Sequence, residues 1–441
     1  MSLFLRRRSD MAFPLVALFF MISARWCLEV AHAGRQVFDV MDFGAIADGE
    51  TDDSKAFIRA WMKACASPGR AAVVIPKGEY RLQPVVFRGP CKGYMEVRLA
   101  GVLRAPDDLA AFRGSHEWIN FASIDGLLVT GGGTFDGRGE SSWHLNECPT
   151  NPNCKPLPVV SRLGRVRNVT ITAVTSLNSK FFHVIIIGSQ DVSIHRVTIR
   201  APRDSPNTDG VHIQGSSNVR ITDTAIATGD DCVSVGPGSA DITVSGVSCG
   251  PGHGISVGSL GRHPGEEDVR GLRVSNCTLA GTANGVRIKT WRGGLRPGSV
   301  VSGLVFEDIV MRKVRNPIII DQEYCPYSSS SCRHESVRTT SSNFLSNPRN
   351  RSYGLSLTEL IMQAQRPSVV KISDVKFKNI RGVSATQVAV KLSCSGASPC
   401  HGLELRDIDL RYVKRGVATE SQCENVDGGV AGGMLVPPSC I

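Results

Sequence analysis

One short stretch decides the fold, and it reads Val192-Ser-Ile-His-Arg-Val197-Thr-Ile199. The pattern apolar-x-apolar-x-x-apolar-x-apolar, rich in Val, Ile and Thr, is typical of half-buried strands. The same pattern begins at residues 169, 219, 242, 272, 304, 370 and 403. Successive copies, counting the quoted one, therefore start 23, 27, 23, 30, 32, 66 and 33 residues apart. Repetition at this interval, with no helical pattern between the copies, predicts a solenoid.

Each copy has one apolar face, which is too narrow to form a core by itself. Stacking the copies along an axis buries a continuous apolar core. A β-sandwich would instead place its strands at roughly 8–12-residue spacing, joined by hairpin turns. The chain is therefore predicted to be all-β, a parallel β-helix of about ten coils in one domain from residue 34 to residue 441.

The first coil of such a stack needs a cover, because its apolar core would otherwise meet water. Residues 38–43 are predicted to form a strand, and a helix follows that starts at Asp52 or Asp53. The helical spacing places four residues inward: Ala56, Phe57, Ala60 and Trp61. We expect this helix to cap the N-terminal end of the stack.

Four short polar motifs, framed by small residues, lie in the middle of the chain. They are Asn207-Thr-Asp209-Gly210, Gly229-Asp230-Asp231-Cys232, Gly252-His253-Gly254 and Arg287-Ile-Lys289-Thr290. Asp209 lies 21 residues before Asp230, and Asp231 lies 22 residues before His253, which matches one coil of the repeat. Because neighbouring strands stack about 4.8 Å apart, these groups should lie together on adjacent coils.

The carboxyl groups point to glycoside hydrolysis. That reaction needs a proton for the leaving oxygen and an activated water or a nucleophile at the anomeric carbon. Three carboxylates this close cannot all stay ionised, so one of Asp209, Asp230 and Asp231 should hold a proton. Neighbouring strand residues point to opposite faces, so a bend is needed to turn both Asp230 and Asp231 outward, and Gly229 allows one.

His253, Arg287 and Lys289 add one titratable group and two fixed cations. The histidine can hydrogen-bond a carboxyl group and help to fix its protonation. Arg287 and Lys289 are two residues apart, hence on one face of a strand, where they suit the carboxylate of a uronic acid. Taken alone, each motif also fits a solvated turn, a surface histidine or solvated strand charges. The combination favours an acid-catalysed glycosidase that acts on an acidic sugar.

Together the motifs resemble those of the polygalacturonase family, glycoside hydrolase family 28, and the resemblance runs from about residue 38 to residue 440. Plant members are similar in the longer strings Ser205–Gly210, Cys249–Ser256 and Arg287–Trp291. The resemblance implies a right-handed helix and inverting hydrolysis of the 1,4-alpha-D-galacturonosidic linkages of pectin. It makes Asp230 the general acid and gives the activation of water to Asp209 and Asp231. It implies no metal and no cofactor.

The resemblance also implies binding roles. Tyr324, in Asp321-Gln-Glu-Tyr324-Cys325, packs against the sugar, although core packing is the alternative. Asn207 orients Asp209 or a substrate hydroxyl. The strings Asn178–His183 and Ser384–Lys391 resemble exo-acting, pollen-type members and favour release of single galacturonates over endo cleavage. More distant alternatives are a calcium-dependent pectate lyase and a non-catalytic pectin-binding wall protein.

The N-terminus is typical of a secretory signal peptide. Three arginines (residues 6–8) precede an apolar run at residues 12–22, and Ala31-His-Ala33 offers a cleavage site. Eleven apolar residues are too few for a membrane anchor, which needs roughly 20. Cleavage after Ala33 removes four arginines and two acidic residues, so the formal net charge falls from +10 to about +8. We expect a secreted, cell-wall monomer that binds polyanionic pectin, with neither a nucleic-acid nor a membrane partner.

Cysteine usage predicts disulfide bonds, as in other secreted chains. The predicted pairs are Cys65–Cys91, Cys148–Cys154, Cys232–Cys249, Cys325–Cys332, Cys394–Cys400 and Cys423–Cys440, with Cys277 as a free thiol. Glycosylation sequons occur at Asn168, Asn276 and Asn350. Residues 337–363 break the repeat, and a retained intron or a genuine surface loop could each explain them.

Overall fold

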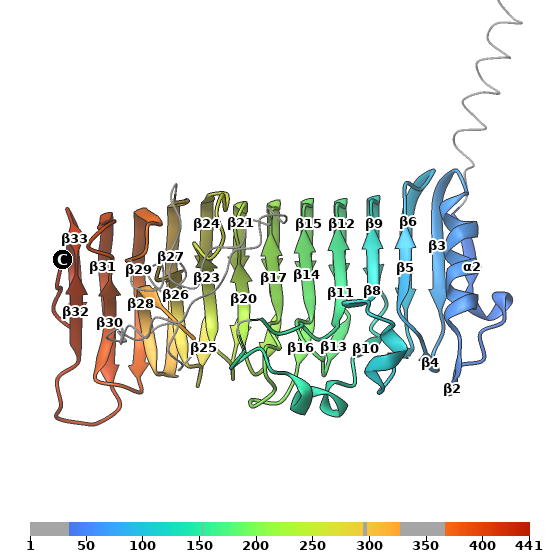
Figure 1. The fold of residues 1–441 in the computed structure, drawn as a ribbon, viewed down its shortest axis with the longest axis horizontal. Helices are drawn as coiled ribbons and strands as arrows, with labels where there is room; N and C mark the ends of the chain where they lie inside the picture. Colours follow the sequence, from blue (N-terminus) through green and yellow to red (C-terminus); the bar gives the residue numbers. More distant parts are fainter. Residues whose placement is uncertain (1–34, 152, 294–297, 327–366) are drawn as a thin grey trace, which may run out of the picture.

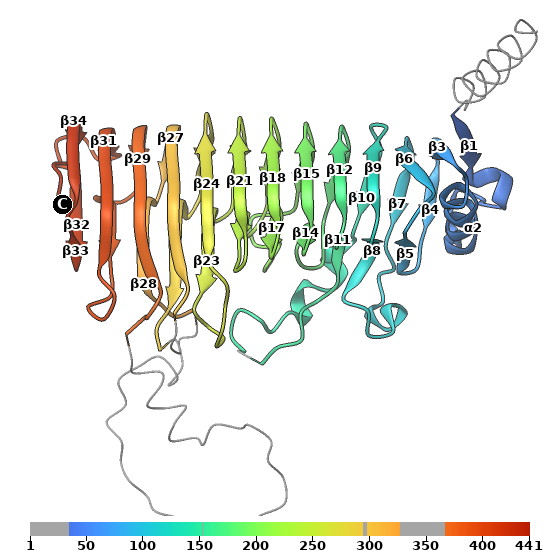
Figure 2. The ribbon, with the colours of Figure 1, turned by 90° about the horizontal axis from the view of Figure 1, so that it is seen from above.

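The computed structural model describes residues 35–151, 153–293, 298–326 and 367–441. They form a right-handed parallel β-helix, in which each strand pairs in parallel with the strand one coil away. Figures 1 and 2 show the coils side by side along one axis, from blue at the N-terminal end to red at the C-terminal end. The predicted fold class is confirmed.

One face of the β-helix is an eleven-stranded sheet. Its strands are β5 (Val85–Arg88), β8 (Glu117–Ala122), β11 (Val159–Gly164), β14 (Val184–Ile187), β17 (Val211–Gln214), β20 (Asp231–Val235), β23 (Gly254–Leu260), β26 (Asn284–Trp291), β28 (Asn316–Tyr324), β30 (Val388–Ser393) and β32 (Glu420–Glu424). Eleven strands agree with the expected number of coils.

A second sheet closes the remaining faces in two rows. The longer row is β1 (Gln36–Asp39), β3 (Gly69–Ile75), β6 (Gly93–Leu99), β9 (Asp125–Thr130), β12 (Arg167–Thr172), β15 (Gln190–His195), β18 (Ser217–Thr222), β21 (Ala240–Ser245), β24 (Val269–Ser275), β27 (Val300–Val314), β29 (Lys371–Ser384), β31 (Cys400–Tyr412) and β34 (Val430–Val436). The shorter row is β2 (Asp48–Asp52), β4 (Glu79–Arg81), β7 (Val102–Arg104), β10 (Thr134–Asp136), β13 (Thr175–Leu177), β16 (Thr198–Arg200), β19 (Ala225–Ala227), β22 (Ser248–Cys249) and β25 (Thr278–Ala280). The later strands β27, β29 and β31 span both rows, and β33 (Val426–Asp427) pairs with β31.

The sequence repeat corresponds to the longer row. The first residues of the copies at 169, 192, 219, 242, 272 and 304 pair with one another in register, from β12 to β27. One copy is corrected: Leu304 pairs with Val375, and Val375 pairs with Leu403, so the copy starts at residue 375 and not at residue 370. The reason is that the apolar residues 370, 372, 375, 377 and 380 repeat the same spacing after five residues, so that a copy can be started at residue 370 or at residue 375.

The predicted N-terminal cap is present, with one boundary moved. The helix α2 (Ser54–Cys65) lies across the end of the stack and buries Ala56, Phe57, Ala60 and Trp61 (Figure 1). The strand predicted for residues 38–43 ends at Asp39, and residues 40–43 form a 3-10 turn, η1 (Val40–Phe43). The cause is local, because the Asp39 side chain accepts a hydrogen bond from the backbone N–H of Met41 and starts the turn.

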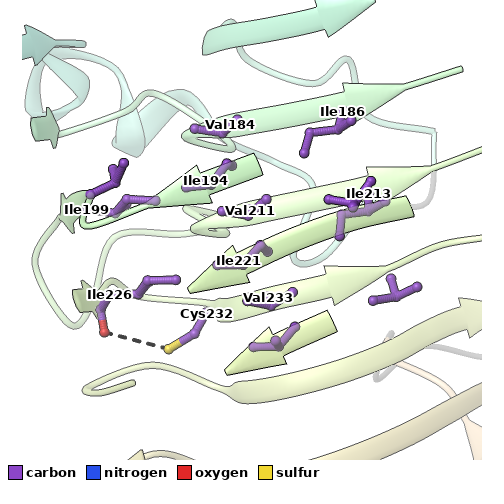
Figure 3. Close-up of a cluster of buried hydrophobic side chains, with 14 of the residues drawn as sticks. Val184, Ile186, Ile194, Ile199, Val211, Ile213, Ile221, Ile226, Cys232 and Val233 are labelled. Carbon is purple, nitrogen blue, oxygen red and sulfur yellow. Dashed lines mark hydrogen bonds between the residues drawn. The ribbon is translucent and has the colours of Figure 1, made fainter. Parts of the chain in front are cut away.

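Aliphatic side chains of both sheets fill the interior (Figure 3). Val184, Val211 and Val233 follow one another in register in the eleven-stranded sheet. Ile194 and Ile221 of the second sheet lie beside them, and all five side chains are buried. These rows are the continuous core that the repeat predicted.

Five of the predicted disulfide bonds are found within the described residues. They are Cys65–Cys91, Cys148–Cys154, Cys232–Cys249, Cys394–Cys400 and Cys423–Cys440. Cys325 is also disulfide-bonded, and its predicted partner Cys332 lies outside the described residues. Cys277 is a buried free thiol, as predicted.

Two predicted segments, the signal peptide (residues 1–33) and the insertion (residues 337–363), lie outside the described residues, and so does Asn350. Asn168 and Asn276 are exposed, as a glycosylation site requires. Within the described ranges, no helix has the length and apolar character needed to cross a membrane.

Candidate active site

The predicted site residues come together on five adjacent strands of the eleven-stranded sheet, β17, β20, β23, β26 and β28. Asp209 lies just before β17, Asp231 is the first residue of β20, and His253 lies just before β23. Arg287 and Lys289 belong to β26. Residues that are 22 to 36 positions apart in the chain thus become neighbours, because each coil returns the chain to the same face.

The expected bend occurs at Asp230. This residue precedes β20, and the register with β23 shifts between Asp231 and Val233. Gly229 permits the close approach of the previous coil, because a Cβ atom there would lie 2.0 Å from the carbonyl oxygen of Ser205. The bend therefore depends on a residue without a side chain.

Asp231 is held ionised by the two cations. Arg287 Nη2 lies 3.0 Å from its Oδ1, and Lys289 Nζ lies 2.8 Å from its Oδ2, while the carboxylate is only 1% exposed. Ser256 Oγ donates a further hydrogen bond at 2.7 Å. Burial alone would raise the pKa of Asp231, but Lys289 and Arg287 outweigh burial and hold it well below its usual range.

Asp209 is in the opposite situation. It is 5% exposed and accepts a hydrogen bond from Ser234 Oγ at 2.7 Å. Burial first, and then the charges of Asp230 and Asp231, raise the pKa of Asp209 well above its ordinary value. The three carboxyl groups therefore cannot all stay ionised, and they hold one proton between them at mildly acidic pH.

Asp230 is the carboxyl group that a ligand can reach, because 17% of its side chain is exposed. His253 Nδ1 lies 2.9 Å from its Oδ1, and the backbone N–H of Asp231 donates to the same oxygen at 2.7 Å. The hydrogen bond to Asp230 raises the pKa of His253 above 6.5. Asn207 Nδ2 donates to Asp230 Oδ2 at 3.4 Å, so this amide orients Asp230, whereas the sequence had linked it to Asp209 or a hydroxyl.

Tyr324 is the last residue of β28 and lies beside the cations. Lys289 Nζ is 5.4 Å from the centre of its ring, and the guanidinium carbon of Arg287 is 6.0 Å away. Trp291 meets the ring edge-on, with 5.5 Å between the ring centres. The tyrosine is partly exposed, so it borders the site and is not a core residue.

Sequence analysis did not assign three supporting residues to the site. Ser234 and Ser256 point outward from β20 and β23, where each holds one carboxylate. His212 shares the Ser234 hydroxyl through Nδ1 at 2.8 Å, and burial lowers the pKa of His212 to about 4. The signal for the serines was present, because each is a lone polar residue between two apolar residues of an alternating strand.

A metal ion would meet an unsuitable donor set here. Asp230, Asp231 and His253 offer ligand atoms within 4.8 Å of one another. Both carboxylate oxygens of Asp231, however, already bind the side chains of Arg287 and Lys289. A divalent cation would have to displace these fixed positive charges or sit against them, which like-charge repulsion opposes.

Comparisons with known proteins agree with this geometry. The model of the family described as "Glycosyl hydrolases family 28" matches residues 65–344 and 360–434. An exopolygalacturonase from Platanus acerifolia is 42% identical over 92% of this chain and 98% of its own. An exopolygalacturonase from Oenothera organensis is 43% identical over 88% of this chain and 98% of its own.

Solved structures show the same fold at lower identity. The endo-xylogalacturonan hydrolase from Aspergillus tubingensis has a TM-score of 0.72 at 22% identity, covering 90% of this chain and all of its own. A hyperthermoactive exopolygalacturonase from Thermotoga maritima has a TM-score of 0.65 at 17% identity, covering 89% and 92%.

Proposed function

The chain belongs to family 28 of the glycosyl hydrolases, and on that premise we propose how it acts. It hydrolyses the 1,4-alpha-D-galacturonosidic linkages of polygalacturonan and removes single galacturonates from the chain end. Exopolygalacturonases that are 42% and 43% identical over about nine-tenths of the chain support the exo mode.

One observation carries the proposal. The buried carboxylate of Asp231, which is paired with two cations, lies next to the accessible carboxyl group of Asp230, which is hydrogen-bonded to His253. Arg287 and Lys289 supply two positive charges and Asp231 one negative charge, so one positive charge is left over. A galacturonate carries one carboxylate, which can bind to this excess charge. Tyr324 offers a ring face and edge to the sugar beside it.

Asp230 donates the proton to the glycosidic oxygen as the C1–O bond breaks. It is suited to this role because it is the most accessible of the three carboxyl groups, and His253, protonated, lies against it. His253 keeps its proton above pH 6.5 and can supply Asp230 with one between turnovers.

Asp209 and Asp231 hold the water that attacks the anomeric carbon from the opposite face, which inverts it. Asp209 takes the proton of this water, because its raised pKa makes it a better acceptor than Asp231, whose pKa is low. The three carboxyl groups thus share one proton, which lies on Asp230 before the step and on Asp209 after it. The raised pKa of Asp209 favours the product side of this transfer.

Asp230→Asn tests the assignment, with Asp241→Asn on the second sheet as the control. The first variant should lose roughly 10²–10⁴-fold in kcat on polygalacturonate while it still binds the polymer, and the control should keep its rate. Wild-type enzyme at mildly acidic pH should release monogalacturonate alone. A ladder of saturated oligomers would instead indicate endo cleavage, unsaturated products a lyase, and unchanged binding with no product a wall-binding protein.

The proposed localisation and partner of the enzyme follow from the same family membership. Its disulfide bonds fit an oxidising compartment, and residues 1–33 act as the signal peptide of a secreted, cell-wall monomer. Residues 34–441 then form one catalytic domain whose partner is homogalacturonan, with neither a nucleic acid nor a membrane as a partner.

A further inference from the structure

The chain between β10 and β11 projects from the face that carries the site (Figure 2). Residues 137–151, here called the arm, contain the 3-10 turns η3 (Gly139–Ser141) and η4 (Trp143–Leu145). Asn146 Nδ2 donates to Pro206 O at 3.3 Å and to Asn207 Oδ1 at 3.2 Å. Since Asn207 hydrogen-bonds Asp230, the arm reaches within two hydrogen bonds of the general acid.

The base of the arm is fixed by residues 178–183, one of the strings that resemble exo-acting relatives. Lys180 is 1% exposed, and its Nζ donates to the carbonyl oxygens of Gly137 and Arg138, each at 2.9 Å. Trp143 Nε1 donates to the carbonyl oxygen of Ser179 at 2.9 Å. A buried cation that binds the arm's backbone holds it firmly, because loss of the cation would remove the Lys180 donor from Gly137 and leave Arg138 with the Ser141 hydroxyl as its side-chain donor.

The substrate cleft that the proposed function requires would have the outward face of the eleven-stranded sheet as its floor, and this floor differs on the two sides of Asp230. On the N-terminal side, Ile185 and Ile187 of β14 point outward next to Phe181 and Phe182, whose stacked ring centres are 4.5 Å apart. These side chains line a mostly apolar pocket of about 220 Å³, whose lining also includes Arg162, already paired with Glu117. A polygalacturonate chain carries one carboxylate per sugar, and burying it against this floor would be costly.

The C-terminal side offers positive charge. The outward row that contains Ser256 continues in register to Arg287, Ile319 and Lys391 on β26, β28 and β30. Lys391 is exposed, so it can bind a carboxylate beyond the Arg287–Lys289 pair. The charge therefore favours a polymer that runs from Asp230 toward the C-terminal coils.

We propose that the arm closes the cleft on the N-terminal side of Asp230 and that Asn146 is the positioning residue that sets the exo mode. The inference rests on the proposed function and deepens it. The galacturonate to be released lies between the arm and Asp230, and the rest of the polymer extends over β26, β28 and β30. Asn146 acts through Asn207, whose amide it orients toward Asp230.

The test uses two oligogalacturonates of equal length, one with a bulky group on its reducing end and one with the group on its non-reducing terminal sugar. Wild-type enzyme should hydrolyse the first to monogalacturonate and leave the second intact. Asn146→Ala should hydrolyse the second at least about tenfold faster than wild type does and release oligomers from polygalacturonate. Its kcat should fall more than its KM rises, since Asn207 loses its orientation. A gain of activity cannot come from misfolding.

Two further variants sharpen the test. Asn146→Asp keeps the oxygen that accepts the N–H of Cys148 and replaces the Nδ2 donor with an oxygen of a negatively charged carboxylate, so it should lose the link to Asn207 as Asn146→Ala does. Asn153→Ala, an exposed residue of the same connection, is the matched control and should behave like wild type. The inference is overturned if wild type hydrolyses the blocked substrate, or if folded Asn146 variants still release monogalacturonate alone. Absence of any hydrolysis by wild type would instead refute the proposed function.

Discussion

Asp231→Asn should destabilise the protein, because it removes the anion that neutralises two buried cations. The side chains of Arg287 and Lys289 are 12% and 10% exposed, so water can replace little of the lost interaction. Removing one partner of a buried pair costs about 3–5 kcal/mol, and the amide oxygen still accepts hydrogen bonds, so we expect about 3 kcal/mol. With roughly 2.1 cal/mol/K per residue over about 400 residues, the Tm should fall by about 4 °C.

Thermal unfolding followed by circular dichroism measures this shift, with Glu323→Gln as the matched control. Glu323 pairs with Arg292 at 3.1 Å, but it is 59% exposed, so the loss should stay below about 1 kcal/mol. A double variant with Lys289→Met should be less destabilised than the sum of the two single variants, since it also removes an unpaired cation. Equal Tm shifts for Asp231→Asn and for Glu323→Gln would refute the reasoning. So would a double variant whose loss of stability equals the sum of the losses of the two single variants.

The pH dependence of the stability difference between wild type and Asp231→Asn gives a second check. The folded protein holds the pKa of Asp231 below its ordinary 3.8, so the stabilisation is complete above that pH and is lost as the pH falls. The gap in stability between wild type and Asp231→Asn should therefore close at acid pH. A gap that widens on acidification would have the wrong sign.

Three further outcomes are expected. The pKa of His253 is raised, so hydrolysis should persist above pH 6.5 and decline only as the pH rises through that raised pKa. A pH–rate profile of His253→Gln should lack this decline. Gly254→Ala should lower the free energy of unfolding in urea by more than about 1 kcal/mol, because Gly254 has φ +93 and a Cβ there would lie 2.1 Å from the carbonyl oxygen of Asn284. Gly132→Ala is the control and should lower it less, because Gly132 has φ +83 but open space around its Cβ position. EDTA should leave the rate on polygalacturonate unchanged, and a loss restored by calcium would revive the lyase alternative.

The fold could be predicted because one row of strands carries its pattern in short, regular units. From β12 to β27 the copies pair in the predicted register, since each buries the same alternating side chains. The prediction was wrong where the apolar spacing repeats after five residues: residues 370 and 375 both start an apolar pair, and only pairing with β27 selects Val375. It was also wrong at residues 40–43, where the Asp39 side chain ends the strand.

The site was predictable to the extent that its residues recur once per coil. Asp209, Asp231 and His253 lie at the starts of three successive strands, so their spacing alone placed them together. The differing pKa shifts of Asp209 and Asp231 were not predictable, because they depend on burial and on which carboxylate Lys289 contacts.

The arm was beyond the reach of such reasoning. Asn146 and Asn207 are 61 residues apart, which is no multiple of the local repeat, and their contact depends on the path of an irregular loop. The resemblance had linked residues 178–183 to exo-acting relatives without explaining how these residues would favour the exo mode. The proposed role of the arm offers an explanation: Lys180 is 1% exposed and binds the arm's backbone. In the proposed arrangement, this lysine shapes the product without touching the substrate, because it holds the segment proposed to limit how much polymer fits beside Asp230.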